Sequence, residues 1–159
     1  MSPALRKKLF GAAGASALAI ATLMIPELEG VRFEPYRDVA GVLTVCYGHT
    51  GADIVPGKRY TQAECKAILD KDLLPFARSV NRSVKVPATE YQKAALISFS
   101  YNVGVSAFER SSLLRKLNAG DYAGACDGLH QWIYAGGKPW KGLMNRRDIE
   151  HEVCTWGQK

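Results

Sequence analysis

The pattern of hydrophobic and polar positions divides the chain into three regions. Residues 9–25, LFGAAGASALAIATLMI, contain no charged side chain. Residues 31–60 combine Val, Thr and Tyr with frequent glycines and a Pro-Gly pair, which is typical of short strands joined by turns. From Thr61 onward apolar residues recur at helical spacing. We therefore expect an apolar N-terminal segment, a small β region and a mainly helical remainder.

Helix start and stop signals organise the third region. Thr61 and Glu64 have the spacing of a capping box and predict a helix to about Val80, in which Pro75 can introduce a kink. Further helices are predicted over residues 89–102, 111–118, 121–132 and 143–156. The result is an α+β fold, with a small β lobe over about residues 27–60, a larger helical lobe over about 61–159, and a cleft between them as the natural ligand site.

The apolar segment is either a signal peptide or a membrane anchor, because residues 6–8 (Arg-Lys-Lys) precede it. As a helix it spans about 25 Å, slightly less than a hydrocarbon core of about 30 Å. The small residues that signal peptidase requires lie inside the run, and a cut near Gly30 would remove Glu29 from the body. We favour an uncleaved anchor over residues 1–26, with the N-terminus cytoplasmic and the body outside. A cleaved signal peptide and a buried helix of a cytosolic protein are the alternatives.

The net charge is +6, but residues 1–26 contribute three basic side chains and no acid. Without them, 18 Lys and Arg oppose 15 acids, so the body carries only about +3. This mild charge suits a polyanionic wall or membrane surface. No basic helix with interleaved aromatic residues is present, so we expect no nucleic-acid partner.

The four cysteines, Cys46, Cys65, Cys126 and Cys154, are even in number and widely spaced. No Cys/His cluster has zinc spacing, and no histidine follows His151 at the interval of a metalloprotease helix, so we expect no metal or other cofactor. If the body is exported, disulfides can form. Of the three pairings we prefer Cys46–Cys65 with Cys126–Cys154, and four buried thiols are the alternative.

The candidate chemistry lies within the segment EGVRFEPYRDVAGVLTVCYGHTG, residues 29–51. Glu29 stands beside a glycine, and Asp38 precedes a glycine turn into a strand that bears Thr44. Two acids nine positions apart usually are surface charges, but these three side chains can converge on one mouth of the cleft. Glycoside hydrolysis needs a proton donor, a second carboxylate and a group that places water.

These motifs resemble the T-even phage lysozyme family, glycoside hydrolase family 24. Glu29, Asp38 and Thr44 form the pattern E-x8-D-x5-T, and the sequence GHTG follows at 48–51. The resemblance continues through NVG at 102–104, SLLRKLNAGD at 112–121, WIYAGGKPWKGLMNRR at 132–147 and the final helix. It covers residues 27–159. The whole chain is similar to the signal-anchor-release endolysins of lambdoid phages, most closely the phage 21 type.

The resemblance implies a lysozyme-like fold and assigns roles to the three candidates. Glu29 is expected to be the general acid that protonates the glycosidic oxygen. Asp38 is expected to be the second carboxylate, acting as base or stabilising the oxocarbenium-like state, and Thr44 to position the attacking water. The family inverts configuration at the sugar.

Supporting residues also follow from the resemblance. His49 is expected to be structural and paired with Asp72 on the first body helix. Asn102 and Trp132 are expected to line the groove, and Arg146 to pair with Glu29.

The resemblance implies a muramidase that hydrolyses the β-1,4 bonds between N-acetylmuramic acid and N-acetylglucosamine in peptidoglycan for host cell lysis. We expect a monomer held in the host inner membrane through residues 9–25 and released into the periplasm when a holin or pinholin collapses the membrane potential. Because the anchor contains no cysteine, activation by exchange with an anchor thiol is not expected. A secreted lysozyme, a lytic transglycosylase and a wall-binding protein with a dead site are the alternatives.

Overall fold

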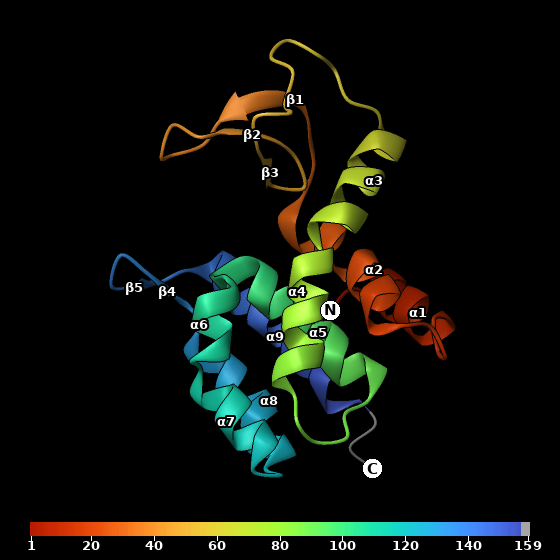
Figure 1. Ribbon diagram of the computed structural model, residues 1–159, viewed down its shortest axis with the longest axis vertical. Coiled ribbons are helices and arrows are strands. Elements are labelled where there is room, and N and C mark those ends of the chain that lie inside the picture. Colours follow the sequence, from red (N-terminus) through yellow and green to blue (C-terminus); the bar gives the residue numbers. More distant parts are fainter. Residues whose placement is uncertain (157–159) are drawn as a thin grey trace.

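The computed structural model describes residues 1–156 and consists of two lobes connected by helix α3 (Gln62–Asp72), as Figure 1 shows. A three-stranded sheet forms the upper lobe, and the other helices form the lower one. The predicted α+β division is therefore confirmed. The remaining helices are α1 (Pro3–Gly11), α2 (Ala17–Glu29), α4 (Leu74–Ser83), α5 (Glu90–Val103), α6 (Val105–Glu109), α7 (Ser112–Asn118), α8 (Tyr122–Asp127), η1 (Gly128–Gln131) and α9 (Lys141–Thr155).

The β lobe contains the antiparallel strands β1 (Arg32–Arg37), β2 (Leu43–Cys46) and β3 (His49–Thr50), in that order. In their register Tyr36 faces Thr44, and Thr44 in turn faces Thr50. The turn between β1 and β2 carries Asp38, whose backbone N–H donates to the carbonyl of Val42 at 3.0 Å. The β region predicted from residue composition is thus present.

Helix α3 begins with the predicted capping box, in which Thr61 and Glu64 bond each other's backbone. The structure ends this helix at Asp72 and starts α4 at Leu74, so the single helix predicted to reach Val80 is wrong. Pro75 lies in the first turn of α4, where backbone N–H groups have no acceptor within the helix, so the absence of one costs no hydrogen bond. The proline therefore marks a helix start instead of a kink.

Helix α5 is the central helix of the lower lobe and begins with a second capping box between Thr89 and Gln92. It ends at Gly104, which has a φ of 95° that favours glycine. Eight of its residues are buried, because α2, α4 and α9 all pack on it. The predicted helix over 89–102 is confirmed.

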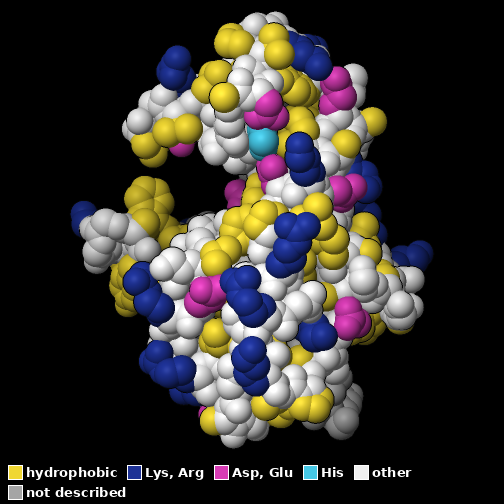
Figure 2. Space-filling view, in the orientation of Figure 1, with side chains coloured by type: hydrophobic (Ala, Val, Ile, Leu, Met, Phe, Trp, Pro, Cys, Tyr) yellow, Lys and Arg dark blue, Asp and Glu magenta, His cyan; other side chains and the backbone are white. Residues whose placement is uncertain are grey.

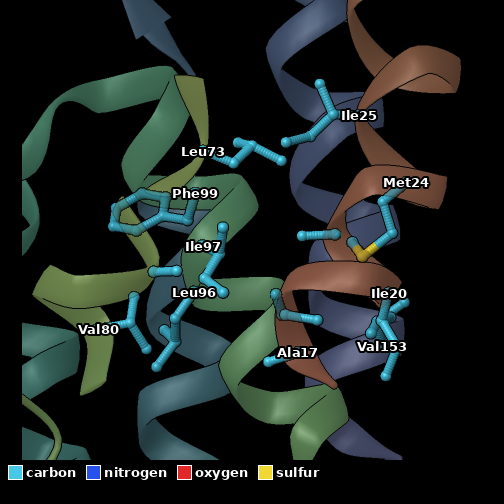
Figure 3. Close-up of a cluster of buried hydrophobic side chains, with 14 of the residues drawn as sticks. Ala17, Ile20, Met24, Ile25, Leu73, Val80, Leu96, Ile97, Phe99 and Val153 are labelled. Atoms are coloured by element: carbon cyan, nitrogen blue, oxygen red, sulfur yellow. The ribbon is translucent and has the colours of Figure 1, made fainter. Parts of the chain in front are cut away.

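The uncharged run of residues 9–25 is divided between two helices of the helical lobe: it supplies the end of α1 and the first part of α2. Gly14, with a φ of 88°, lies in the turn between α1 and α2. Figure 3 shows Ile20 of α2 beside Val153 of α9 and Ile25 extending toward Leu73, and Ile20, Met24 and Ile25 are 0–1% exposed. Within residues 1–156, no helix is long and apolar enough to cross a membrane.

The C-terminal part differs from the prediction in two places. The helix predicted over 121–132 is α-helical only to Asp127 and continues as the 3-10 helix η1 to Gln131. A hairpin of β4 (Tyr134–Ala135) and β5 (Lys138–Pro139) was not predicted, because strands of two residues leave no periodic pattern. Its signal was the Gly-Gly turn, whose glycines have φ values of 59° and 78°.

Two disulfides connect elements distant in sequence. Cys46–Cys65 joins β2 to α3 with a Cα–Cα distance of 5.1 Å. Cys126–Cys154 joins α8 to α9 with a Cα–Cα distance of 5.7 Å. The structure therefore forms the two pairings that we preferred from the sequence.

Candidate active site

A groove between the two lobes is visible as the hollow on the left side of the molecule in Figure 2. One cavity of about 470 Å³ lies between β3, α3 and α5, and a second of about 420 Å³ lies beside the hairpin and α9. Glu29 and Asn102 line both cavities. The groove therefore passes over the side chain of Glu29.

Glu29 is the last residue of α2, and Gly30 follows with a φ of 68°. The chain can turn sharply here because glycine tolerates this backbone conformation. The Glu29 side chain is 27% exposed and accepts a hydrogen bond from Arg146 of α9. The ion pair expected between these two residues is therefore formed, and it fixes the carboxyl group at the floor of the groove.

Asp38 projects from the opposite lobe. Its Oδ1 accepts hydrogen bonds from the backbone N–H groups of Ala40 and Val42, both at 2.9 Å. These donors fix the orientation of the carboxylate. Among residues 1–156, no group donates a hydrogen bond to the other oxygen of Asp38, which leaves it free for water or substrate.

Thr44 lies on β2 and is 4% exposed. Its hydroxyl donates to the carbonyl of Val42 at 2.9 Å, so the same residue contacts both Thr44 and Asp38. Neither Asp38 nor Thr44 is among the residues that line the two cavities around Glu29. The structure places the three candidates on the two lobes that face each other, with Glu29 below and Asp38 and Thr44 above.

His49 ties the lobes together, as expected for a structural residue. Its Nδ1 lies 2.7 Å from the carboxylate of Asp72, and its Nε2 lies 2.9 Å from that of Asp53. Burial opposes the charged imidazole, but the hydrogen bonds and charges of the two aspartates outweigh it and raise the pKa of His49. The interaction with His49 lowers the pKa of Asp53.

The expected groove residues separate into two groups. Asn102 lines the groove, and Arg146 lines it below Glu29. Trp132 is not among the lining residues of either cavity; its ring packs edge-on against Phe99 with centroids 5.2 Å apart. Trp132, the first residue of the motif at 132–147, was expected to line the groove, whereas in the structure it packs against the core.

Four aromatic groove residues were not predicted from the sequence: Tyr47, Phe76, Tyr101 and Trp140. Trp140 is 58% exposed, and its indole N–H donates to the carbonyl of Ala135 at 2.8 Å. An exposed tryptophan directly after a Gly-Gly hairpin was the available signal. Burial, together with the negative charges of Asp72 and Glu29, raises the pKa of Tyr101, so its hydroxyl stays protonated in the groove.

Among the described residues, no group of three or more His, Cys, Asp or Glu side chains is placed to hold a metal ion. Glu29 and Arg146 bring a carboxyl group and a guanidinium to the groove from the helical lobe, and Asp38 and Thr44 present a carboxylate and a hydroxyl group on the β lobe. A carboxyl group on each side of a sugar-sized groove is the arrangement of glycoside hydrolases.

Comparisons with known proteins agree with this geometry. A family model described as phage lysozyme matches residues 26–150. The SAR-endolysin of Bacteriophage PS119 is 57% identical over 165 aligned positions, covering 100% of this chain and 99% of the relative. The SAR-endolysin of Enterobacteria phage P21 is 54% identical and covers 100% of both chains.

A solved structure extends the likeness to the N-terminal helices. The active form of the P1 phage endolysin Lyz matches with a TM-score of 0.79 and 25% identity, covering 98% of this chain and 94% of that one. Since the family model and the relatives span most of the sequence, the chain belongs to the phage lysozyme family.

Proposed function

We propose that this phage lysozyme acts as an endolysin that hydrolyses the β-1,4 bonds between N-acetylmuramic acid and N-acetylglucosamine in peptidoglycan, with Glu29 as the general acid. The observation that carries the proposal is the position of Glu29 at the point where both cavities of the groove meet. A protonated Glu29 can donate to the glycosidic oxygen of a glycan that crosses this point.

Asp38 and Thr44 supply the other half of the reaction. Asp38 acts from the β lobe as the base or as the stabiliser of positive charge on the sugar, and Thr44 positions the attacking water. Two carboxyl groups on opposite sides of the glycan leave room for a water molecule between the second carboxylate and the sugar, as inversion requires. The backbone donors on Asp38 support this role, because they hold the carboxylate in one orientation.

Replacing Glu29 with Gln tests the acid. We expect murein hydrolysis to fall by about 10²- to 10⁴-fold, the usual contribution of a general acid. Glu27→Gln is the matched control, because Glu27 lies on the same helix and pairs only with the exposed Lys8 at 3.4 Å. Near-normal clearing of murein by the Glu29 variant would remove Glu29 from the mechanism.

Product analysis separates hydrolysis from the transglycosylase alternative. Hydrolysis adds water and leaves a reducing sugar end, whereas a lytic transglycosylase leaves an anhydro end. We expect mass spectrometry of digested murein to show reducing ends. Anhydro ends would overturn the hydrolytic assignment while leaving Glu29 as an acid.

We further propose that residues 1–26 act as a signal anchor before the enzyme becomes active. The curated relatives are named SAR-endolysins and align over the whole chain. In this proposal the chain is exported uncleaved, held at the outer face of the inner membrane, and released to the periplasm when a holin or pinholin dissipates the membrane potential. The structure then corresponds to the released form.

The position of Glu29 supports regulation through the anchor. Pro26, Glu27 and Leu28 alone separate the apolar run from Glu29, and Pro26 is part of helix α2. Drawing α2 into a bilayer would take its buried face, including Ile25, away from α5 and displace Glu29 from Arg146. Anchoring therefore inactivates the enzyme by removing its acid from the groove.

N-terminal sequencing of the exported protein tests the anchor against a cleaved signal peptide. A start at Met1 or Ser2 is expected. A start after residue 20 would contradict the anchor, and it would also delete most of the buried side chains of α1 and α2 from the helical lobe.

A further inference from the structure

Glu150 is a buried acid that the catalytic trio does not use. It lies on α9, facing α5, and its side chain is 0% exposed. Acidic side chains are rarely buried completely unless they are paired. Its contacts therefore identify its role.

Each oxygen of Glu150 contacts a different arginine. Oε1 accepts hydrogen bonds from the hydroxyl of Ser98 at 2.7 Å and from Nε of Arg146 at 3.2 Å. Oε2 lies 2.8 Å from Nη1 of Arg147 in an ion pair. Both arginines are buried with it, at 4% and 0% exposure.

The two arginines carry these contacts on to the groove. Arg146 donates to Glu29 and, through Nη2, to the carbonyl of Ser98 at 3.1 Å. Arg147 donates to the side-chain oxygen of Asn102 and lies over the ring of Phe99. The two groove residues shared by both cavities, Glu29 and Asn102, are thus each held by an arginine that Glu150 holds.

Charge balance makes this arrangement dependent on Glu150. Two buried guanidinium groups repel each other: burial and the charge of Arg146 lower the pKa of Arg147, and the charge of Glu150 opposes this shift. Burial raises the pKa of Glu150, which the two arginines and Ser98 oppose. Glu150 supplies the fully buried negative charge of this network, and its removal leaves the two guanidinium groups without a buried counter-charge.

We propose that Glu150 is a positioning residue for glycan hydrolysis: it orients Arg146 and Arg147 so that they hold Glu29 and Asn102 in the groove. This inference rests on the proposed role of Glu29 as the acid. It assigns to the fold a second acid that never touches substrate but controls both the place and the charge environment of the first.

Other charged groups around the network are accounted for within residues 1–156. Across the groove, Asp72 pairs with His49, and Tyr101 is a neutral neighbour. The histidines of α9 and η1 pair with aspartates: His151 with Asp127 at 2.8 Å and His130 with Asp148 at 3.2 Å. Glu150 is therefore the acid that neutralises the arginine pair from within the lobe.

The test compares Glu150→Gln with Glu150→Asp in the full released chain, with soluble glycan fragments as substrate. Glutamine keeps the size and removes the charge. We expect kcat to fall by about 10- to 100-fold, as for a displaced catalytic group, with a smaller change in KM. We also expect the alkaline limb of the pH–rate profile to move to lower pH by about one unit, because the unopposed arginines stabilise ionised Glu29.

Aspartate keeps the charge and shortens the side chain. We expect Glu150→Asp to lower kcat but to leave the alkaline limb at its wild-type pH. If Glu150→Gln does not fold, Glu150→Asp tests the positioning role by itself. Wild-type kcat in a folded aspartate variant would overturn the positioning role.

The matched control is Glu109→Gln on α6. Glu109 likewise accepts from a serine hydroxyl, that of Ser79 at 2.9 Å, and from an arginine, Arg82 at 2.6 Å, but it is far from the groove lining. We expect neither kcat nor the pH–rate profile to change. If Glu150→Gln behaves like this control while Glu29→Gln is inactive, the inference fails and the proposed function stands. An active Glu29→Gln would overturn the proposed function itself.

Discussion

The two N-terminal helices, which share the uncharged run of residues 9–25 between them, attach to the body in different ways. Helix α2 packs an apolar face on α5, with Ile20, Met24 and Ile25 buried, and ends at Glu29. Helix α1 buries only Leu5 and Leu9. Its other contacts with the body are made by exposed side chains, such as the ion pair of Arg6 with Glu152 and the stacking of Phe10 on Trp156. The comparison shows that α2 positions the site, whereas α1 packs mainly against α2 and away from the groove.

The polar attachments of this region use backbone groups at the break between the helices, where the carbonyl of Leu9 also accepts from the N–H of Ala12 at 3.1 Å. The hydroxyl of Tyr91 donates to the carbonyl of Leu9 at 2.8 Å, and the N–H of Ala17 donates to Glu90 at 2.6 Å. In one continuous helix both backbone groups would bond within the helix. The body therefore contacts the N-terminal run in a way that favours its broken form.

The largest effect is expected when one buried side chain of each helix is truncated and the two variants are compared. Ile25→Ala and Leu9→Ala both remove fully buried groups, so each should cost about 2–5 kcal/mol of unfolding free energy. Only Ile25→Ala should also lower kcat of the enzyme that remains folded, because α2 carries Glu29. Urea unfolding and single-temperature kinetics of the purified chain measure both quantities. Equal loss of kcat in the two variants would contradict the division of roles.

A smaller effect is expected at the break itself. Gly14 has a φ of 88° and open space around an added Cβ, so Gly14→Ala should destabilise the released form by about 1–2 kcal/mol through backbone strain alone. It should also favour a continuous helix and delay lysis. Gly11→Ala is the control, because Gly11 belongs to α1 and also has open space. Equal lysis times for both variants would count against the break as the released conformation.

The contacts to the backbone groups at the break should each contribute less. Tyr91→Phe and Glu90→Gln are expected to lower the unfolding free energy by about 0.5–1.5 kcal/mol, and the side chain of Glu90 is 49% exposed, which places it at the low end. Tyr122→Phe is a matched control for Tyr91, because the Tyr122 hydroxyl also donates to a backbone carbonyl, that of Pro87 at 2.6 Å. Delayed lysis is expected for Tyr91→Phe and not for Tyr122→Phe. Identical lysis times would show that Tyr91 does not distinguish the broken form.

The smallest effect concerns the contacts of His49 with Asp53 and Asp72. These contacts depend on pH, whereas the apolar packing of α2 does not. Because the folded pKa of His49 is raised, its contribution to stability is complete below its unfolded pKa of about 6.5 and is lost as the pH rises through the folded value. The wild type should therefore lose unfolding free energy over that range relative to His49→Gln. Parallel stability curves for the two proteins would contradict the ion pairs of His49.

Local signals in the sequence predicted much of this fold, and long-range contacts account for what it did not predict. The capping box at Thr61 marked one helix start, since its partner Glu64 lies three residues later, and the helix start predicted near Thr89 coincides with a second capping box in the structure. The uncharged run was ambiguous because small apolar residues suit a bilayer and a helix interface equally. Which environment it occupies depends on α5, far away in sequence.

The site shows the same contrast. The motif of Glu29, Asp38 and Thr44 pointed to the acid through its resemblance to a family. Glu150 was missed because an acid on a C-terminal helix usually faces solvent. Its spacing of three and four residues after Arg147 and Arg146 was the available signal, but only the packing of α5 shows that all three are buried.

The central claim is that anchoring residues 1–26 in the membrane holds Glu29 away from its place in the groove. Its most direct test inserts a flexible Gly-Ser linker after Pro26 and measures murein hydrolysis by the chain while it is still held in right-side-out membrane vesicles. The linker frees Glu29 from the anchor, so the tethered variant should be active where the tethered wild type is not. A tethered linker variant as inactive as the tethered wild type would contradict the claim.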